Sequence, residues 1–210
     1  TSYAKDLSRY AEKVGADALL VVTPYYNKCT QNGLVAHYTA IADSVNIPLI
    51  LYAVPSRTGV TIKTETYRRL ARHPRIAAVK EASGDLSAIL RLRHACGDEL
   101  AVYSGNDDQI VPILSLGGQG VISVLSNVAP RMTHDIVAEY MNGNVAESTR
   151  LQLAAIPLIK ELFNEVNPIP VKAAMKLQGY ATGDVRGPLS WIEPEHEAAL
   201  KKAMQDAGIL

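Results

Sequence analysis

The sequence predicts an α/β unit built on a parallel β-sheet, because apolar runs of strand length alternate with helical patterns along most of the chain. Each run is nearly continuous in apolar side chains, which is typical of a strand buried on both faces of a parallel sheet. The alternating order favours right-handed βαβ crossovers. The expected strands are Ala18–Val22, Pro48–Tyr52, Ile76–Val79, Leu100–Tyr103 and Gly120–Val124.

Residues that favour helix ends mark the helices between these strands. Gly15 is expected to end the first helix, Pro74 follows another, and Asp85 and Asp107 are expected to be N-caps. The predicted helices are Ser2–Val14, Gln31–Ser44, Lys63–Arg72, Leu86–Ala95, Asp107–Leu116 and Pro130–Met141. Five strands fit either an open doubly wound sheet or part of a closed barrel, which needs eight strands and about 250 residues.

The strand pattern stops at Asn142-Gly143-Asn144, and the rest of the chain is predicted to be helical. This last segment is short for an independent core, so we expect it to cover one side of the α/β unit. The chain thus divides into an α/β part over residues 1–143 and a helical extension over residues 144–210. The expected helices of the extension are Val145–Glu165, Ile169–Leu177 and Pro194–Ala207.

Composition excludes several classes of protein. With 48% hydrophobic and 20% charged residues, the chain is able to bury a core and is not expected to be disordered. Its 21 basic and 21 acidic residues balance, so no general charge favours nucleic acid or an anionic membrane. No apolar run reaches the ~18 residues of a membrane span. Two isolated cysteines, Cys29 and Cys96, suit a reducing compartment, and we expect a soluble, cytoplasmic protein.

Lys80 is the most informative strand-end residue. It ends the apolar run IAAVK, and ligands of parallel α/β proteins bind at the carboxyl ends of strands. Partial burial there would lower the pKa of the lysine and allow it to form a Schiff base with a carbonyl substrate. The alternative is a solvated lysine, or one that is paired with Glu81.

Tyr52 and Arg57 follow the neighbouring predicted strand. A tyrosine beside the lysine amine would relay protons, whereas the alternative is a packed ring with a satisfied hydroxyl. The planar guanidinium of Arg57 would bind a carboxylate through two hydrogen bonds, whereas the alternative is an exposed loop arginine. The five histidines are scattered, so no metal site is expected, and GGQG has the spacing of no phosphate-binding motif.

Six motifs in register carry a resemblance to a known family. They are TPYYNK, YAVPSRTG, VKEASGD, YSGNDD, GGQGVISV and NPIPVK, and the chain resembles the dihydrodipicolinate synthase family of pyruvate-dependent class I aldolases along its whole length. The resemblance implies a (β/α)8 TIM barrel with a C-terminal helical extension, assembled as a homotetramer of two tight dimers. Residues 1–143 then correspond to a partial barrel that carries the last five strands, and about the first three βα units are lacking.

The same resemblance implies a lyase of the diaminopimelate and lysine pathway. It condenses pyruvate with L-aspartate 4-semialdehyde to 4-hydroxy-tetrahydrodipicolinate and needs neither metal nor organic cofactor, because the iminium is the electron sink. It implies that Lys80 binds pyruvate covalently, Tyr52 shuttles protons and Arg57 binds the carboxylate of the semialdehyde. Tyr26 would complete the proton relay of the partner subunit. Main-chain groups that line the pyruvate pocket are expected at Gly105 and Ile122.

Three departures from the family pattern affect these expectations. If the opening units are truly absent from the molecule, we expect no turnover, because raw sheet edges would remain. Ala53 replaces the usual asparagine after the shuttle tyrosine and is expected to remove a polar group near the site. Tyr3 stands at an acidic position of the lysine-inhibition site, so inhibition by lysine is expected to be weak.

Two rival functions remain open at this point. One is another pyruvate aldolase, such as an N-acetylneuraminate lyase, against which Arg57 argues because it suits a second small carboxylate. The other is a truncated and catalytically silent subunit. Imine trapping with pyruvate separates the second rival from an active enzyme.

Overall fold

The computed structural model describes all 210 residues, and they form two compact units. The first unit comprises residues 1–106 and 112–122, and the second comprises residues 107–111 and 123–210. The division into a barrel part and a C-terminal extension stays a prediction. None of the helices is both long and apolar enough to cross a lipid bilayer.

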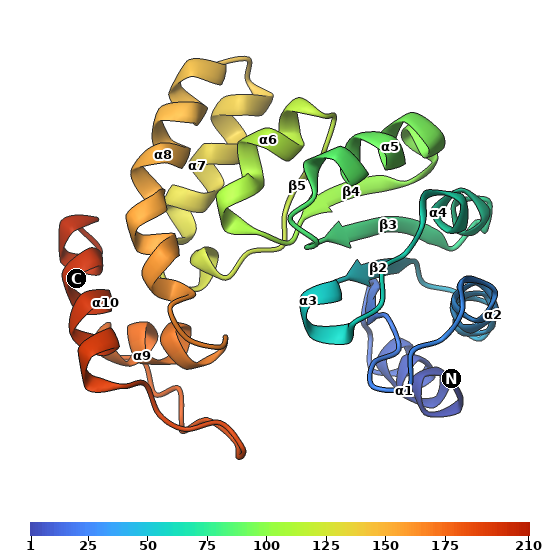
Figure 1. The fold of residues 1–210 in the computed structure, drawn as a ribbon, viewed down its shortest axis with the longest axis horizontal. Coiled ribbons are helices and arrows are strands. Elements are labelled where there is room, and N and C mark those ends of the chain that lie inside the picture. Colours follow the sequence, from blue (N-terminus) through green and yellow to red (C-terminus); the bar gives the residue numbers. More distant parts are fainter. The chain divides into compact units, whose positions relative to one another are not determined.

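The first unit is built on a five-stranded parallel sheet whose strands lie in chain order, β1-β2-β3-β4-β5 (Figure 1). All five predicted strands are present. The last is shorter than predicted, because the chain leaves the ladder after Ile122, whose N–H donates to the carbonyl oxygen of Ser104 at 2.9 Å. The strands are β1 (Leu19–Val22), β2 (Leu49–Ala53), β3 (Ile76–Glu81), β4 (Ala101–Ser104) and β5 (Gly120–Val121).

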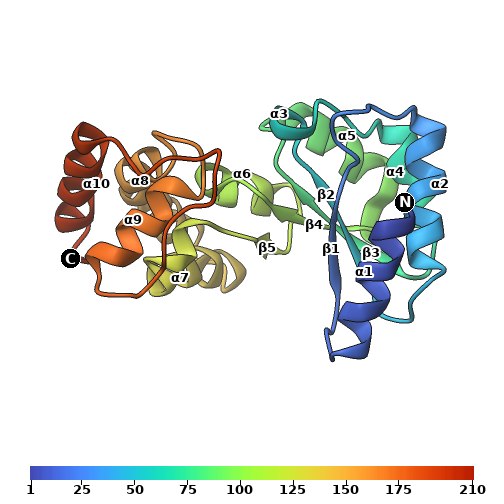
Figure 2. The same cartoon turned by 90° about the horizontal axis from the view of Figure 1, so that it is seen from below.

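The helices of the first unit show how the sheet is wound. Helix α2 contacts α4, and α4 contacts α5, so the three lie in a row along one face of the sheet (Figure 1). Helix α1 lies beside α2, as Figure 2 also shows. A doubly wound sheet reverses its strand order and carries helices on both faces. This sheet keeps its strands in chain order and carries its row of helices on one face, so it is singly wound and the doubly wound alternative is excluded. The helices are α1 (Ser2–Lys13), α2 (Gln31–Ala42), α3 (Pro55–Thr58), α4 (Thr64–Ala71) and α5 (Leu86–Cys96), followed by the 3-10 helix η1 (Gly97–Glu99).

Burial differs between the two faces of the sheet. Leu49, Leu51 and Ala53 alternate along β2 and are buried under the helices, where each leucine contributes roughly 2 kcal/mol. Tyr52 on the other face is only half-buried, and Leu20 of β1 is 46% exposed. The expectation that the strands are buried on both faces is therefore wrong for this chain, because the row of helices covers one face only.

Asp85 and Asp107, the two predicted N-caps, behave differently in the structure. Asp85 is the N-cap of α5, as expected, and its Oδ1 accepts the N–H of Ala88 at 2.9 Å. The predicted helix from Asp107 begins instead as a 3-10 turn, η2 (Asp107–Gln109), and continues as α6 (Ile110–Ser115). Oδ2 of Asp107 accepts the N–H groups of Val124 and Leu125 at 3.0 and 2.9 Å, so this carboxylate holds the start of another 3-10 turn, η3 (Leu125–Asn127).

The second unit is helical, as the sequence predicts. Helix α7 packs against α8, and α10 packs against α8 and α9. Side chains such as Leu158, Leu162 and Leu200 are fully buried between them, and the Ser148 hydroxyl donates to the carbonyl oxygen of Ile136 at 2.6 Å. The helices are α7 (Pro130–Met141), α8 (Val145–Leu162), α9 (Ile169–Leu177) and α10 (Pro194–Asp206).

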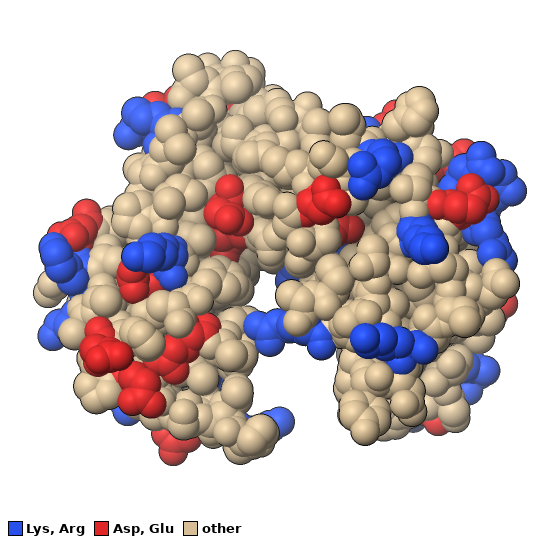
Figure 3. Space-filling view, viewed as in Figure 1, with Lys and Arg blue, Asp and Glu red and all other residues tan.

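Charged side chains are dispersed over the surface. On the face that Figure 3 shows, Lys and Arg and Asp and Glu form small groups that are separated by uncharged residues. This pattern agrees with the formal net charge of zero. The face therefore offers no broad single-sign field that would attract a polyanion.

We predict that an ion pair makes the stability of the second unit depend on pH. Nδ1 of His196 lies 2.8 Å from Oε1 of Glu165, and this bond raises the histidine pKa. A raised pKa stabilises the fold fully below the unfolded value, about 6.5, and this stabilisation is lost as pH rises through the folded pKa. The midpoint of thermal unfolding should separate wild type from His196→Asn more at about pH 6 than at about pH 9. His94→Asn, at an exposed histidine, is the control, and a gap independent of pH would contradict the prediction.

Candidate active site

The register between β2 and β3 brings the two main candidates together. Tyr52 pairs with Lys80 across the two strands, and Nζ of Lys80 lies 4.5 Å from the centroid of the Tyr52 ring. Both side chains are half-buried, on the sheet face that the helices leave uncovered. The ammonium is attracted by the face of the ring, and this attraction directs the lysine along the strand ends towards the phenol.

The environment of Tyr52 keeps its phenol protonated. Burial raises the pKa of Tyr52 above its ordinary value, and the positive charge of Arg57 opposes this shift. Arg57 lies on the one-turn helix α3, directly after β2, and is exposed. The arginine is therefore close enough to act on the phenol, and it belongs to an exposed part of the chain that a ligand can reach.

Gly105 and Ile122 continue the site across the next strands. The N–H of Gly105 donates to the carbonyl oxygen of Glu81 at 2.7 Å. A Cβ at this glycine would lie 2.6 Å from Cβ of Ala82 and 3.1 Å from Cε of Lys80, so the backbone of β4 packs directly against the lysine stem. Ile122 is bonded through its N–H to β4, one strand further from Lys80.

Tyr26 is set apart from this group. Its side chain is 90% exposed, and its φ of 66° lies in the left-handed region that L-residues rarely adopt. This backbone conformation costs roughly 1–2 kcal/mol. A side chain this exposed packs against neither Lys80 nor Tyr52 of its own chain.

The structure contains a hydrogen-bonded pair of threonines that the sequence did not predict. Oγ1 of Thr23 donates to Oγ1 of Thr58 at 3.0 Å, and both residues are buried. Thr58 in turn donates to the carbonyl oxygen of Val54 at 3.2 Å. The pair ties the segment after β1, which leads to Tyr26, to the helix that carries Arg57. The only signal in the sequence is that each threonine lies inside a motif, and this does not reveal the contact.

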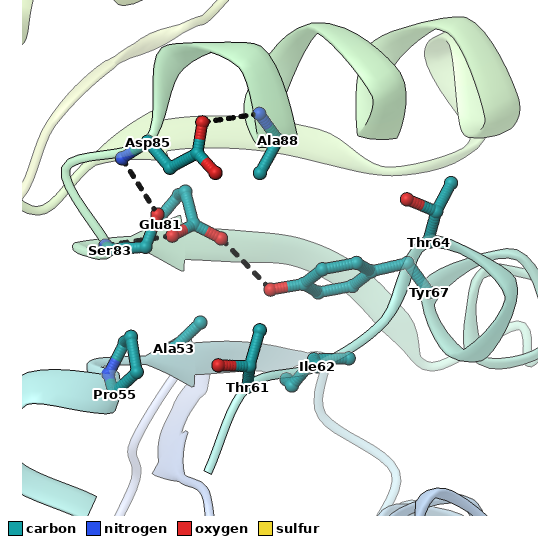
Figure 4. Close-up of a pocket in the computed structure, with 10 residues that line it drawn as sticks. All are labelled: Ala53, Pro55, Thr61, Ile62, Thr64, Tyr67, Glu81, Ser83, Asp85 and Ala88. Carbon is teal, nitrogen blue, oxygen red and sulfur yellow. Dashed lines mark hydrogen bonds between the residues drawn. The ribbon is translucent and has the colours of Figure 1, made fainter. Parts of the chain in front are cut away.

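The sequence offers Glu81 as a partner for Lys80, but in the structure its carboxylate has other partners. It is 5% exposed, and its Oε2 accepts the Tyr67 hydroxyl at 2.9 Å while Oε1 accepts the N–H of Ser83 at 2.8 Å (Figure 4). Consecutive residues of a strand point to opposite faces, so Glu81 faces the helices and Lys80 the uncovered face. A carboxylate in a buried strand position is the signal that would have identified it.

A cavity of about 220 Å³ lies beside the Glu81 carboxylate. Ala53 lines this cavity and is 3% exposed, as Figure 4 shows. Ala53 and Tyr52 point to opposite faces of β2, so the polar group that Ala53 is expected to remove near the site would have faced this cavity. No cluster of three or more His, Cys, Asp or Glu side chains is placed to hold a metal ion. The lining residues are Ala53, Pro55, Thr61, Ile62, Thr64, Tyr67, Glu81, Ser83, Asp85 and Ala88.

Fold and site together define a β/α enzyme, with a lysine and a tyrosine at the ends of neighbouring parallel strands. The chain belongs to the dihydrodipicolinate synthetase family, whose sequence profile matches residues 1–207.

Individual relatives agree with this assignment. A protein of Caldicellulosiruptor bescii named 4-hydroxy-tetrahydrodipicolinate synthase is 52% identical over 209 residues, which cover 100% of this chain and 70% of the relative. The structure of the Cyanidioschyzon merolae enzyme with lysine bound matches with a TM-score of 0.95 and 40% identity, over 98% of this chain and 70% of that one. The chloride-inhibited dihydrodipicolinate synthase of Acinetobacter baumannii complexed with pyruvate matches with a TM-score of 0.94 and 41% identity, over 98% and 71%.

We predict that Arg57→Gln raises the pKa of Tyr52 further. The arginine charge is what opposes the effect of burial on this phenol, so its loss leaves burial alone. Titration of ¹³Cζ-labelled tyrosine by NMR measures the shift, with Tyr52→Phe to assign the resonance. Arg91→Gln, at an exposed arginine on α5, is the matched control and should leave the titration unchanged. An unchanged Tyr52 titration in Arg57→Gln would refute the electrostatic coupling.

Proposed function

We propose that Lys80 forms an imine with pyruvate and that this imine carries out the condensation with L-aspartate 4-semialdehyde to 4-hydroxy-tetrahydrodipicolinate, on the route to diaminopimelate and lysine. The single observation that supports this role most is the position of the amine, 4.5 Å from the Tyr52 ring centroid at the carboxyl ends of β2 and β3. Family membership and the pyruvate complex of the Acinetobacter relative support the same reaction.

The chemistry requires only the groups that this site holds. The neutral Lys80 amine attacks the keto carbon of pyruvate, and the carbinolamine loses water to give an iminium. The iminium withdraws electrons, so the methyl group loses a proton and the enamine attacks the aldehyde carbon of the semialdehyde. Tyr52 donates and recovers protons in these steps, which suits a phenol that stays protonated at neutral pH. The amino group of the condensed semialdehyde then attacks the iminium carbon, which closes the ring, expels the Lys80 amine and releases the product.

Substrate binding is assigned to three positions around the amine. Arg57 holds the carboxylate of the semialdehyde through its planar guanidinium, which is exposed on α3. Main-chain groups at Gly105 and Ile122 line the pyruvate pocket. The close packing of Gly105 on the stem of Lys80 supports this placement, because it keeps that part of the pocket narrow.

Tyr26 is assigned to the site of a partner subunit. A tyrosine that is 90% exposed and held in a left-handed backbone conformation is arranged for a contact outside its own chain. We therefore propose a homotetramer of two tight dimers in which Tyr26 completes the partner's proton relay. The five parallel strands in chain order also support the closed eight-stranded barrel, which stays a prediction.

Lysine is proposed as a weak inhibitor, and the cytoplasm as the location. The Cyanidioschyzon relative has lysine bound, and here Tyr3 and Tyr25 are 79% and 69% exposed. Tyr3 supplies no negative charge for the lysine ammonium, so binding is weaker than at an acidic residue. Free Cys29 and Cys96 suit a reducing cytoplasm.

The N-acetylneuraminate lyase alternative predicts a different reaction. Arg57, next to Tyr52, is suited to a second small carboxylate and not to a sugar chain. Release of pyruvate from N-acetylneuraminate by the purified protein, without product from pyruvate and the semialdehyde, would favour that alternative.

We predict that borohydride traps pyruvate on Lys80. Reduction of the imine forms a stable secondary amine, so the intact mass rises by the mass of a reduced pyruvyl group and peptide mapping places it at residue 80. Lys80→Arg should abolish trapping, because a guanidinium is not a nucleophile at neutral pH. Lys28→Arg is the control, since Lys28 is an exposed lysine in the loop between β1 and α2. Absence of label in wild type would favour the silent subunit.

We predict that Gly105→Ala slows imine formation by about 10- to 100-fold, because a misplacement of 1 Å costs up to about 100-fold in rate. The new methyl group would lie 2.6 Å from Ala82 Cβ and 3.1 Å from Lys80 Cε, so the lysine stem must shift. Gly187→Ala is the control, because a Cβ there meets nothing within 4 Å. The trapping rate at fixed pyruvate measures the effect, and equal rates in both variants would contradict this prediction.

A further inference from the structure

The residue after the catalytic lysine is a buried carboxylate with a defined set of partners. Glu81 is 5% exposed and accepts hydrogen bonds from the Tyr67 hydroxyl and the Ser83 N–H, at 2.9 and 2.8 Å (Figure 4). Tyr67 is 4% exposed and belongs to α4. The hydrogen bond therefore joins the end of β3 to a helix of the outer layer.

The backbone around Glu81 joins the same strand end to both neighbouring strands. The Glu81 carbonyl oxygen accepts the N–H of Gly105 at 2.7 Å, and the N–H of Ala82 donates to the carbonyl oxygen of Ala53 at 2.9 Å. Residues 81 and 82 are thus held by β2, β4 and α4 at once. Lys80 directly precedes these two residues. The direction of its side chain therefore depends on how the end of β3 is rotated about the strand axis.

Stability alone does not account for a carboxylate at this position. Burying a charge has a desolvation cost, and an apolar side chain of similar volume often stabilises a fold as well or better. Directional hydrogen bonds supply what an apolar contact does not, which is a fixed orientation. Burial and then the neighbouring Glu81 charge raise the pKa of Tyr67 well above its ordinary value, so the hydroxyl keeps the proton that it donates to Glu81.

The cavity beside Glu81 makes this orientation depend on the tyrosine. About 220 Å³ of space is lined by Ala53, Glu81 and Tyr67 among others, so the carboxylate has room to turn if the hydroxyl is lost. A larger side chain than Ala53 would restrict that movement, and none is present. The hydrogen bond from Tyr67 is therefore the contact that limits the Glu81 rotamer on the cavity side.

We propose that the Glu81–Tyr67 pair is a positioning element that fixes the end of β3 so that Lys80 points to Tyr52 and reaches the keto acid. This inference rests on the proposed imine chemistry and assigns the pair no contact with substrate. It acts through Lys80, from the opposite face of the strand.

Tyr67→Phe tests the inference, with Tyr38→Phe as the matched control. Both variants remove one buried hydroxyl that joins a helix to a strand, because the Tyr38 hydroxyl donates to the carbonyl oxygen of Val21 at 3.1 Å. Tyr67→Phe should lower the rate constant of borohydride-trapped imine formation about 10-fold and leave the KM for the semialdehyde unchanged. Tyr38→Phe should lower the unfolding temperature about as much as Tyr67→Phe does, but it should leave the trapping rate at the wild-type value.

Glu81→Gln separates orientation from charge. Its amide oxygen is able to accept the Ser83 N–H, and its NH₂ group is able to donate to the Tyr67 oxygen, so the geometry is kept without the charge. Positioning predicts a trapping rate within about threefold of wild type, since both hydrogen bonds are replaced. A loss as large as that of Tyr67→Phe would overturn positioning in favour of a charge effect.

The remaining outcomes are also decisive. Equal trapping rates in wild type and Tyr67→Phe, with a lowered unfolding temperature in the variant, would show a merely structural pair and overturn the inference alone. Absence of trapping in wild type would overturn the proposed function and this inference with it. The two failures are therefore distinguished by the wild-type reaction.

Discussion

The parallel register of β2 and β3 is the constraint on which the site depends. It pairs Tyr52 with Lys80 and, one residue later, Ala53 with Glu81. Because side chains alternate along a strand, one register places an amine beside a phenol on one face and a carboxylate beside a cavity on the other. A slip of one residue would exchange the two faces and bury the lysine under the helices. Burial of Leu49 and Leu51 under α2 and α4 opposes such a slip, since it would expose both leucines.

The two faces of β3 carry different electrostatic conditions. The helix-covered face is buried, and there a charge persists only with fixed hydrogen-bond partners, as at Glu81. Lys80 and Tyr52 on the other face are half-buried. They remain open to small molecules from solvent, and their burial is sufficient to raise the pKa of Tyr52. An amine and a phenol lie on one face and a hydrogen-bonded carboxylate lies on the other, so the strand end is fixed without covering the face that carries Lys80.

Much of the fold could be predicted from the sequence, because it depends on local patterns. Apolar runs and breakers located every strand, and Asp85 was recognised as a cap because its bond to Ala88 spans three residues. Contacts between distant residues were not predictable in this way. The Thr23–Thr58 bond spans 35 residues and depends on the twist of the sheet, which no local pattern encodes. The exposed second face of the sheet was also missed, because an apolar run does not state what covers it.

In the candidate site, too, position along the chain does not show which residues lie together in space. Strand-end position predicts Lys80, Tyr52 and Arg57 as site residues, because the carboxyl ends of parallel strands must meet at one edge of the sheet. The same rule ranks Glu81 with Lys80, yet their surroundings differ, because the alternation of side chains along the strand places them on opposite faces. For the same reason Ala53, which follows Tyr52 in sequence, pairs with Glu81 and lines the cavity on the opposite face. For residues at strand ends, the face is therefore a stronger guide to function than distance along the chain.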